Sequence, residues 1–332
     1  MASFLIAIAI LVGIALSYAS SKKQRQQHAA WLAAGRRIGL APVGESGEPR
    51  AMWGQVDDHL VRAELVGKDS TLSGVLSVGP VEPSLVIKAE TFAIDLGKAM
   101  LGPDLECGDS VFDDAIFVQS GDQHRAFAAL DHSTRRTIEH AVKNQKISVR
   151  DGVATYSGTD ILTEAGFTEV LRSAQDLVRR LDIEPEMVPG RLLQLLEQDP
   201  SARVRTRALA TLVADFRVTP QADQAIELVG GRDRLELLFL EHLEERTTGQ
   251  MVVLKALAKV GTLACVERLM KLKCDGRLEA LRGATVATIQ KHSGAGEQGW
   301  LSLSADAPSD GGLSTADDAG ALAIAKPEKE PR

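Results

Sequence analysis

The pattern of apolar and polar positions divides the chain into a strand-rich first half and a helical second half. Short β-branched runs separated by Gly and Pro predict strands at 59–66, 71–78, 84–88, 115–118, 146–149 and 153–156. Asp151 and Gly152 between the last two accept the backbone angles of a tight hairpin turn. Apolar positions from Phe127 to Val142, behind a capping Asp122, predict a helix. We therefore predict an α+β domain with a mainly antiparallel sheet.

Beyond this domain the pattern is that of helices. A stripe of apolar residues from Phe167 to Leu181 predicts a long helix, which the Pro- and Gly-containing segment 184–190 ends as a linker. Apolar residues then recur every three or four positions between Gly-containing stops. The helices predicted in this way are 191–197, 200–216, 222–229, 232–245, 250–260, 263–272 and 277–291.

The N-terminal segment is apolar and carries no charge from Ala2 to Ala19. As a helix, these residues reach about 27 Å, near the hydrocarbon thickness of about 30 Å, which predicts a single transmembrane helix. The basic residues after this segment favour an inner-membrane protein with its N-terminus outside and its body in the cytoplasm. The alternative is export after cleavage of a signal peptide at Ser17-Tyr18-Ala19.

The predicted fold class is therefore multi-domain: an N-terminal transmembrane helix, an α+β domain and an all-α solenoid. A C-terminal tail rich in Gly, Ser, Ala, Asp and Pro is expected to be disordered. Within it, three units similar to G-x-L-S-x-A are candidates for a docking motif. The predicted boundaries are 1–21 for the anchor, 22–40 for a basic juxtamembrane segment, 41–183 for the α+β domain with its trailing helix, 184–190 for the linker, 191–293 for the helical repeats and 294–332 for the tail.

Internal similarity links three of the helices, at 205–212, 253–260 and 281–289, where a small residue stands at a fixed place. The segment from Asp199 to Ala208 resembles the D-x-x-x-x-VR-x-x-A segment of HEAT repeats. The resemblance implies a curved solenoid whose extended face binds proteins, with an ordinary helical bundle as the alternative. Asp199 is expected to cap its helix. Arg203, Arg205 and Arg207 are candidate partner-binding residues or a solvated face.

A second resemblance involves Gly108-Asp109 and Phe112-Asp113. The segment is similar to the GD-x-x-FD-x-x-F-x-V pattern of an uncharacterised domain of bacterial membrane-anchored proteins, over residues 31–160, and implies no activity. Asp109, Asp113 and Asp114 are considered as metal ligands or paired acids, but turn and cap roles are favoured. The residues His124, His132 and His140 are spaced eight apart, about 12 Å along a helix, too far for one metal ion.

Composition narrows the function classes. The 332 residues suffice for two domains plus an anchor, with 44% hydrophobic and 25% charged residues, as in globular proteins. A net charge of −7 gives no reason to expect nucleic acid as a partner. The cysteines Cys107, Cys265 and Cys274 have no C-x-x-C spacing, which favours buried free thiols over a disulfide or zinc site.

No motif for phosphate, dinucleotide, nucleophile-elbow, zinc-protease or kinase chemistry occurs in the chain. We therefore expect no cofactor and assign no catalytic residue. The leading hypothesis is a membrane-tethered, non-catalytic scaffold that binds proteins through its helical repeats. The alternative is a membrane-associated enzyme, or an envelope or lipid-surface factor, that acts through the α+β domain. Partners and oligomeric state stay open.

Overall fold

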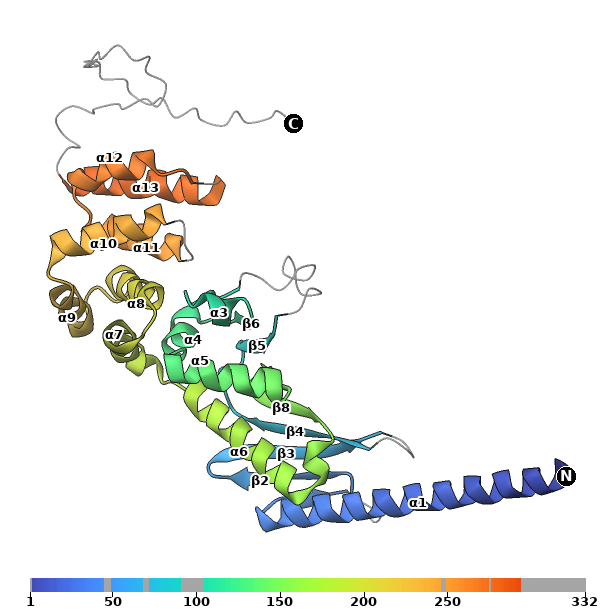
Figure 1. Cartoon of the computed structure of the whole chain (residues 1–332). Helices are drawn as coiled ribbons and strands as arrows, with labels where there is room; N and C mark the ends of the chain where they lie inside the picture. Colours follow the sequence, from blue (N-terminus) through green and yellow to red (C-terminus); the bar gives the residue numbers. More distant parts are fainter. Residues whose placement is uncertain are drawn as a thin grey trace, which may run out of the picture.

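The computed structural model describes residues 2–44, 49–67, 72–90, 104–245, 249–274 and 276–293. The molecule is elongated and curved, with the sheet region towards one end and a stack of helices towards the other (Figure 1). The predicted disordered tail at 294–332 and its G-x-L-S-x-A units lie outside the described residues.

A single eight-stranded sheet forms the first region, with the strand order β1-β2-β3-β4-β8-β7-β5-β6. Each neighbouring pair of strands is antiparallel. The strands are β1 (Ala41–Val43), β2 (Ala51–Val56), β3 (His59–Val66), β4 (Ser73–Gly79), β5 (Val86–Ala89), β6 (Ile116–Gln119), β7 (Ile147–Arg150) and β8 (Val153–Gly158). The β7–β8 hairpin turns through Asp151 and Gly152, both with positive φ, as their Asp-Gly sequence predicts.

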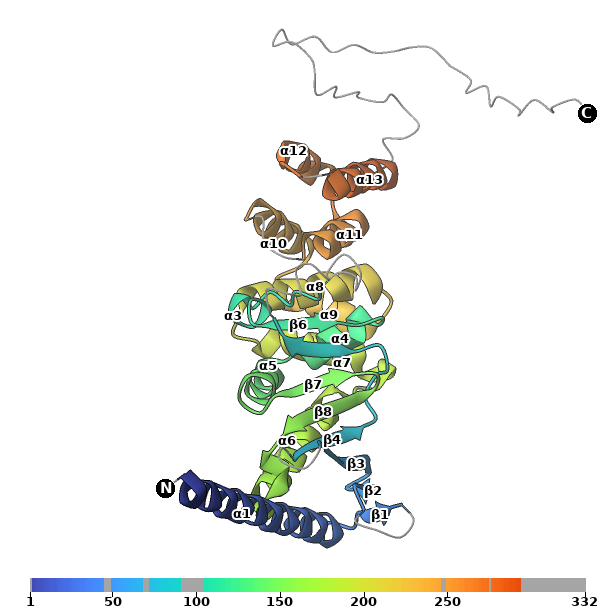
Figure 2. The same ribbon diagram turned by 90° about the vertical axis from the view of Figure 1, so that its right-hand side faces the viewer.

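One face of the sheet is covered by α6 (Glu164–Leu181), which crosses the strands (Figure 1, Figure 2). Thr163 caps this helix by accepting a hydrogen bond from the Gly166 amide. The predicted apolar stripe of α6 is buried from Phe167 to Leu181. Alternate strand residues such as Met52 and Leu76 point to the same side and are fully buried, as the two-residue period of a strand requires.

The N-terminal segment forms one long helix, α1 (Ala2–Arg37), whose C-terminal half packs beside the sheet. Trp31 and Ala34 are buried there. The predicted transmembrane helix at 1–21, and the fold class that contains it, are wrong: no helix among the described residues is long and apolar enough to cross a membrane. The run of residues 4–16, which has no polar side chain, is only 13 residues long, or about 20 Å of helix. The C-terminal half of the same helix contains many polar and basic residues.

Between the strands lie four short helices, α3 (Ser110–Asp113), α4 (Gln123–Ala129), α5 (His132–Glu139) and the π-helix η1 (His140–Asn144). The 3₁₀ turn η2 (Asp160–Leu162) connects the last strand to α6. The single helix predicted through Phe127 and Val142 is wrong. Asp131 accepts a hydrogen bond from the Thr134 amide at 2.7 Å and so begins a second helix after a break at Leu130. Asp122 caps α4, as predicted.

The second region is helical and consistent with a repeat-like domain. After the 3₁₀ turn η3 (Pro185–Met187) come α7 (Val188–Gln198), α8 (Ala202–Asp215), α9 (Pro220–Leu228), α10 (Arg232–Glu244), α11 (Gln250–Val260), α12 (Leu263–Lys271) and α13 (Gly276–His292). Helices α8, α11 and α13 pack in succession, with α10 and α12 alongside (Figure 1).

The three similar segments differ in how they are buried. Ala208 in α8 and Ala256 in α11 are both fully buried, whereas Ala284 at the matching place in α13 is exposed. In α13 the neighbouring Thr285 is buried instead and donates a hydrogen bond to the Leu254 carbonyl at 3.2 Å. The small-residue position therefore serves helix packing in the first two segments only.

Candidate functional site

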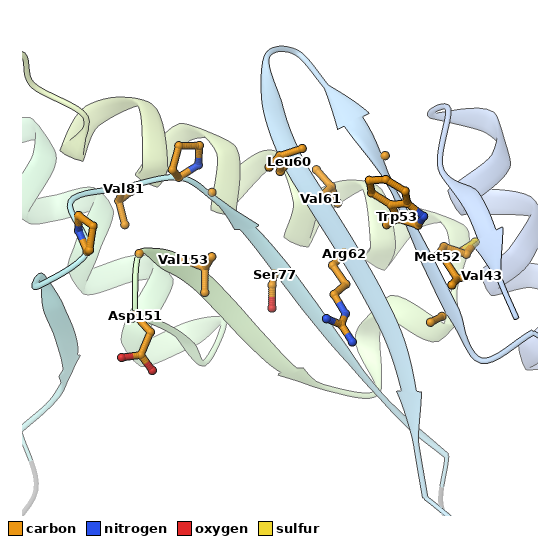
Figure 3. A pocket seen from close by; sticks show the side chains of 16 residues that line it. Val43, Met52, Trp53, Leu60, Val61, Arg62, Ser77, Val81, Asp151 and Val153 are labelled. Atoms are coloured by element: carbon orange, nitrogen blue, oxygen red, sulfur yellow. The ribbon is translucent and has the colours of Figure 1, made fainter.

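A hollow of about 820 Å³ lies on the outer face of the sheet, which α6 does not cover (Figure 3). We call it the outer hollow. It extends across strands β1 to β4 and ends at the β7–β8 turn. Its lining residues are Val43, Ala51, Met52, Trp53, Gly54, Leu60, Val61, Arg62, Ser77, Gly79, Pro80, Val81, Pro83, Asp151, Gly152 and Val153.

Strand register places the side chains of the outer hollow in rows across the sheet. Trp53 of β2 lies opposite Arg62 of β3, and Arg62 lies opposite Ser77 of β4. In the neighbouring row, Leu60 lies opposite Gly79. Successive residues of a strand point to opposite faces of the sheet. The side chains of Trp53, Arg62, Ser77 and Leu60 therefore point away from the hydrophobic core between the sheet and α6.

Large apolar side chains in this hollow are exposed. Trp53 is 58% exposed, Leu60 is 60% exposed and Val43 on the edge strand is 44% exposed. Single exposed apolar residues are ordinary on protein surfaces, but a group of them around one concavity is typical of a binding site. The outer hollow therefore has the character of a docking surface for an apolar group.

A close approach between Gly79 and the β7–β8 turn forms one wall of the outer hollow. A Cβ atom at Gly79 would lie 2.9 Å from the Gly152 carbonyl oxygen, closer than real Cβ contacts allow. The amide of Val81 also donates to this carbonyl at 2.9 Å. Gly79 is thus required for the turn to rest against β4.

The polar side chains around the outer hollow are paired with each other. Arg62 Nε donates to Glu64 at 2.8 Å, and Ser77 Oγ lies 3.4 Å from Thr155 Oγ1. Asp151 at the turn lies 3.5 Å from the Arg150 guanidinium. Because these groups already have partners, the surface that remains for a ligand is mostly apolar.

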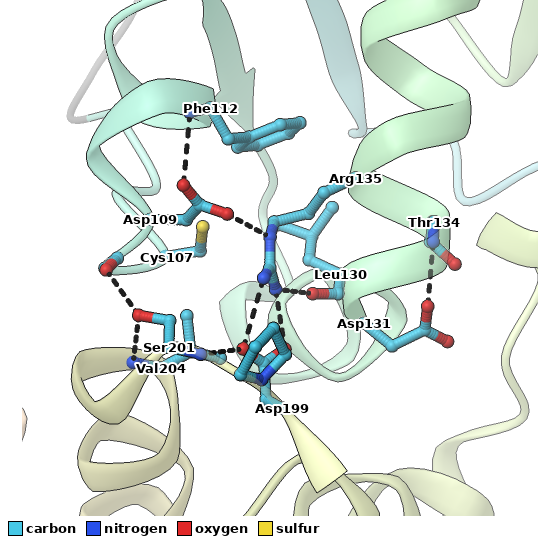
Figure 4. A network of polar contacts seen from close by, with 12 residues as sticks. Cys107, Asp109, Phe112, Leu130, Asp131, Thr134, Arg135, Asp199, Ser201 and Val204 are labelled. Atoms are coloured by element: carbon cyan, nitrogen blue, oxygen red, sulfur yellow. Dashed lines mark hydrogen bonds and ion pairs between the residues drawn. The ribbon is translucent and has the colours of Figure 1, made fainter.

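A second feature is a buried polar network that joins the sheet region to the helical region (Figure 4). Arg135 of α5 is 2% exposed and donates to the Asp199 carboxylate at 2.9 and 3.2 Å and to the Leu130 carbonyl at 2.8 Å. Its Nε donates to Asp109 at 3.0 Å. Burial alone lowers the pKa of Arg135, but hydrogen bonding and charge from Asp199 outweigh it and the pKa is raised. Arg135 therefore stays charged inside the joint.

Asp199 has a different role from the one predicted. The expectation that it caps α8 is wrong: the cap is Ser201, whose Oγ accepts from the Val204 amide at 3.4 Å. Asp199 ends α7, and its carboxylate also accepts from the Ser201 amide at 3.0 Å. The reason is that Arg135, from another region of the chain, occupies the carboxylate.

The aspartates considered as metal ligands or paired acids stabilise the backbone around α3. Asp109 caps α3, and Asp113 accepts from the amides of Cys107 and Gly108, each at 2.9 Å. The Cys107 thiol donates to the same carboxylate at 3.1 Å, and burial raises its pKa well above the ordinary range. Asp114 is the exposed C-cap of α3. Among the described residues no group of three or more His, Cys, Asp or Glu side chains is arranged to hold a metal ion.

The three candidate partner-binding arginines of α8 do not form one exposed cluster. Arg203 is exposed. Arg205 is half-buried and donates to the carbonyls of Asp199 and Pro200 at 2.6 and 3.2 Å. The Arg207 guanidinium lies 4.7 Å from the centroid of the Phe127 ring in α4, and burial lowers its pKa. Arg205 and Arg207 therefore serve contacts inside the molecule.

The three histidines lie on separate elements. His124 of α4 lies 3.4 Å from Asp215 and contacts the edge of the Phe216 ring. His132 is at the start of α5 and is exposed. His140 begins the π-helix. The break at Leu130 places His124 on a different helix from His132 and His140.

Sequence reasoning missed Trp53 and Leu60, although a signal was present. Trp53 belongs to the short apolar run Ala51-Met52-Trp53, which lies just before the strand predicted at 59–66. A strand predicted at β2 would have placed Trp53 and Leu60 on one face of a hairpin.

Comparison of the chain with protein-family models, with curated proteins and with solved structures finds no match.

Proposed function

We propose that this protein is a non-catalytic scaffold that binds a partner protein through the outer hollow. The observation that carries the proposal is the exposure of Trp53 and Leu60 beside a concavity of about 820 Å³. Tryptophan is the residue type most enriched among side chains that dominate interface energies. Truncating such a residue costs about 2 kcal/mol or more of binding free energy.

The shape of the outer hollow favours an amphipathic helix as the bound segment. The hollow crosses strands β1 to β4 rather than following one strand edge. A segment laid across strands meets side chains and not the backbone groups of the sheet, which are already paired. A helix can present apolar residues at i, i+3, i+4 and i+7 without needing backbone hydrogen bonds from its partner.

The helical region is proposed to extend this scaffold. The resemblance of the α8 segment to HEAT repeats, and the succession of α8, α11 and α13, support a solenoid with a further binding face. The contacts of Arg205 and Arg207 leave Arg203 as the one candidate of the three that faces solvent. The buried Arg135 network keeps the two regions in a fixed relative orientation.

Site-specific photo-crosslinking in the full-length chain tests the proposal. A benzoylphenylalanine residue replaces Trp53 in one protein, Leu228 in a second and Arg203 in a third, and cross-linked proteins in the native host are identified by mass spectrometry. Leu228 is 53% exposed on α9 and controls for general apolar exposure. We expect a specific product from the Trp53 position that Leu60→Asp removes. Products from the Arg203 position alone would contradict the outer hollow and favour the helical face.

A further inference from the structure

A groove of about 600 Å³ lies between α6 and the segment formed by α5 and η1, and it shares no lining residue with the outer hollow. Helices α5 and α6 pack against each other along the molecule (Figure 1). Arg136 of α5 and Arg172 and Arg179 of α6 line the groove, with Asp176 as the one carboxylate. We call it the arginine groove. Three guanidinium groups face one carboxylate there, in a chain whose net charge is −7.

Two of these arginines have no partner. Arg136 and Arg172 are exposed and make no ion pair or hydrogen bond within the described part of the chain. Asp176 is already occupied, because Arg180 donates to it at 2.9 Å and Arg179 at 3.4 Å. The arginine groove therefore offers two free guanidinium groups, each able to bind a carboxylate through two hydrogen bonds.

Gln145 also lines the arginine groove, at the C-terminal end of the π-helix η1. Its side-chain oxygen Oε1 is shielded from solvent and has no hydrogen-bond partner within the described residues. The π-helix from His140 to Asn144 places Gln145 here, and π-helical turns occur often at functional sites.

We infer that the arginine groove binds an acidic segment of a partner protein. Its carboxylates pair with the guanidinium groups of Arg136 and Arg172. A peptide fits better than a single phosphate, since the groove continues into a second hollow of about 770 Å³ that shares Arg172 and His140. The second hollow also contains two carboxylates, Glu164, which is paired with Arg37, and the exposed Glu169. The acidic side chains of the segment therefore bind in the arginine groove, and only its continuation lies in the second hollow.

Fluorescence anisotropy with a labelled octaglutamate peptide on the full-length chain tests this inference at about 50 mM salt, where charge interactions are only partly screened. We expect Arg136→Glu with Arg172→Glu to weaken binding by at least about tenfold. The matched control is Arg232→Glu with Arg234→Glu on α10, two exposed and unpaired arginines whose reversal changes net charge equally. The control should change affinity by less than about twofold. Equal weakening in both proteins would overturn the inference.

A competition experiment separates the peptide from a simple anion. Inorganic phosphate at the concentration at which octaglutamate saturates its site should not displace the peptide. Displacement would overturn the inference and assign the groove to small phosphate-like anions instead.

Discussion

The guanidinium of Arg135 and the carboxylate of Asp199 lie 64 residues apart in the chain and meet at 2.9 Å in a site from which solvent is excluded. Arg135 belongs to α5 of the sheet region and Asp199 to the turn between α7 and α8. Ser201 adds a second link across the same joint by donating to the Gly108 carbonyl at 3.1 Å. These contacts make the sheet region and the first helices of the second region one packing unit.

Removing one partner of this pair should destabilise the protein strongly. We expect Arg135→Met to lower the free energy of unfolding by about 3–5 kcal/mol, because Asp199 is left buried and unpaired. Arg136→Met is the matched control, since the adjacent Arg136 is exposed and has no partner in the described structure. It should change stability by less than about 0.5 kcal/mol. Urea denaturation measures both, and similar midpoints for the two variants would contradict a structural role for Arg135.

Charge reversal at two arginines of α8, Arg207 and Arg203, should have different effects on stability. Arg207→Glu should lower the free energy of unfolding by about 1–3 kcal/mol, because it removes the contact with the Phe127 ring and brings a negative charge towards Asp113. Arg203→Glu, at an exposed position, should be neutral within about 0.5 kcal/mol. Thermal melting of the two variants checks this, and a neutral Arg207→Glu would refute the ring contact.

The repeat-like region should depend on Leu209, which is 1% exposed in α8. Leu209→Asp should unfold this region, since an unpaired charge placed in the stack costs several kcal/mol. Ala202→Asp introduces the same side chain on the same helix, at an exposed position in its first turn. It should be tolerated, because a carboxylate is favourable near a helix N-terminus. Circular dichroism at 222 nm reports the loss of helix, and an undiminished signal for Leu209→Asp would contradict the packing of α8.

Stability should fall in alkaline solution because of two buried thiols. Burial is the main cause that raises the pKa of Cys107 beyond the ordinary range and that of Cys265 to about 12. In the unfolded chain both thiols ionise near pH 8.5, so unfolding releases protons above that pH. The stabilisation is complete below about pH 8.5 and decreases as the pH rises towards the folded pKa values.

Urea unfolding between pH 8 and pH 10.5 measures this effect. The free energy of unfolding should fall less steeply with pH in the double variant Cys107→Ala with Cys265→Ala than in the wild type. The two slopes should differ by up to about 1.4 kcal/mol per pH unit for each thiol removed. Identical pH slopes in the two proteins would mean that the thiols ionise equally in the folded and unfolded states.

Local sequence signals predicted most of the helical region. The bounds of α11 match the prediction, and the other six helices after the linker agree within about three residues. The reason is that glycines lie at helix ends: Gly249 and Gly261 are the two caps of α11, and the Gly230-Gly231 pair separates α9 from α10. Strand β3 also matches the prediction. In these segments the local preference and the final packing favour the same structure.

Other features depend on contacts between distant residues. Strands β1 and β2 contain Pro42 and Gly54, which weaken a strand pattern, and they form because β3 pairs with β2 along its length. The Arg135–Asp199 pair could not be predicted, since nothing near either residue indicates the other. Trp53 is exposed because α6 covers the opposite face of the sheet. The residue pattern of one strand does not indicate which face of the sheet a later helix covers, so this exposure could not be predicted.

Selection of peptides from a random phage-displayed library on the full-length protein, followed by measurement of their dissociation constants, tests the proposed docking surface most directly. We predict apolar, helix-forming peptides whose affinity falls by at least about tenfold in Trp53→Ala with Leu60→Ala. In the control, Leu228→Ala with Val218→Ala, which changes two exposed apolar residues outside the outer hollow, the affinity should fall by less than about twofold. Selected peptides that bind the Trp53 and Leu60 variant as tightly as the wild type would contradict binding through the outer hollow.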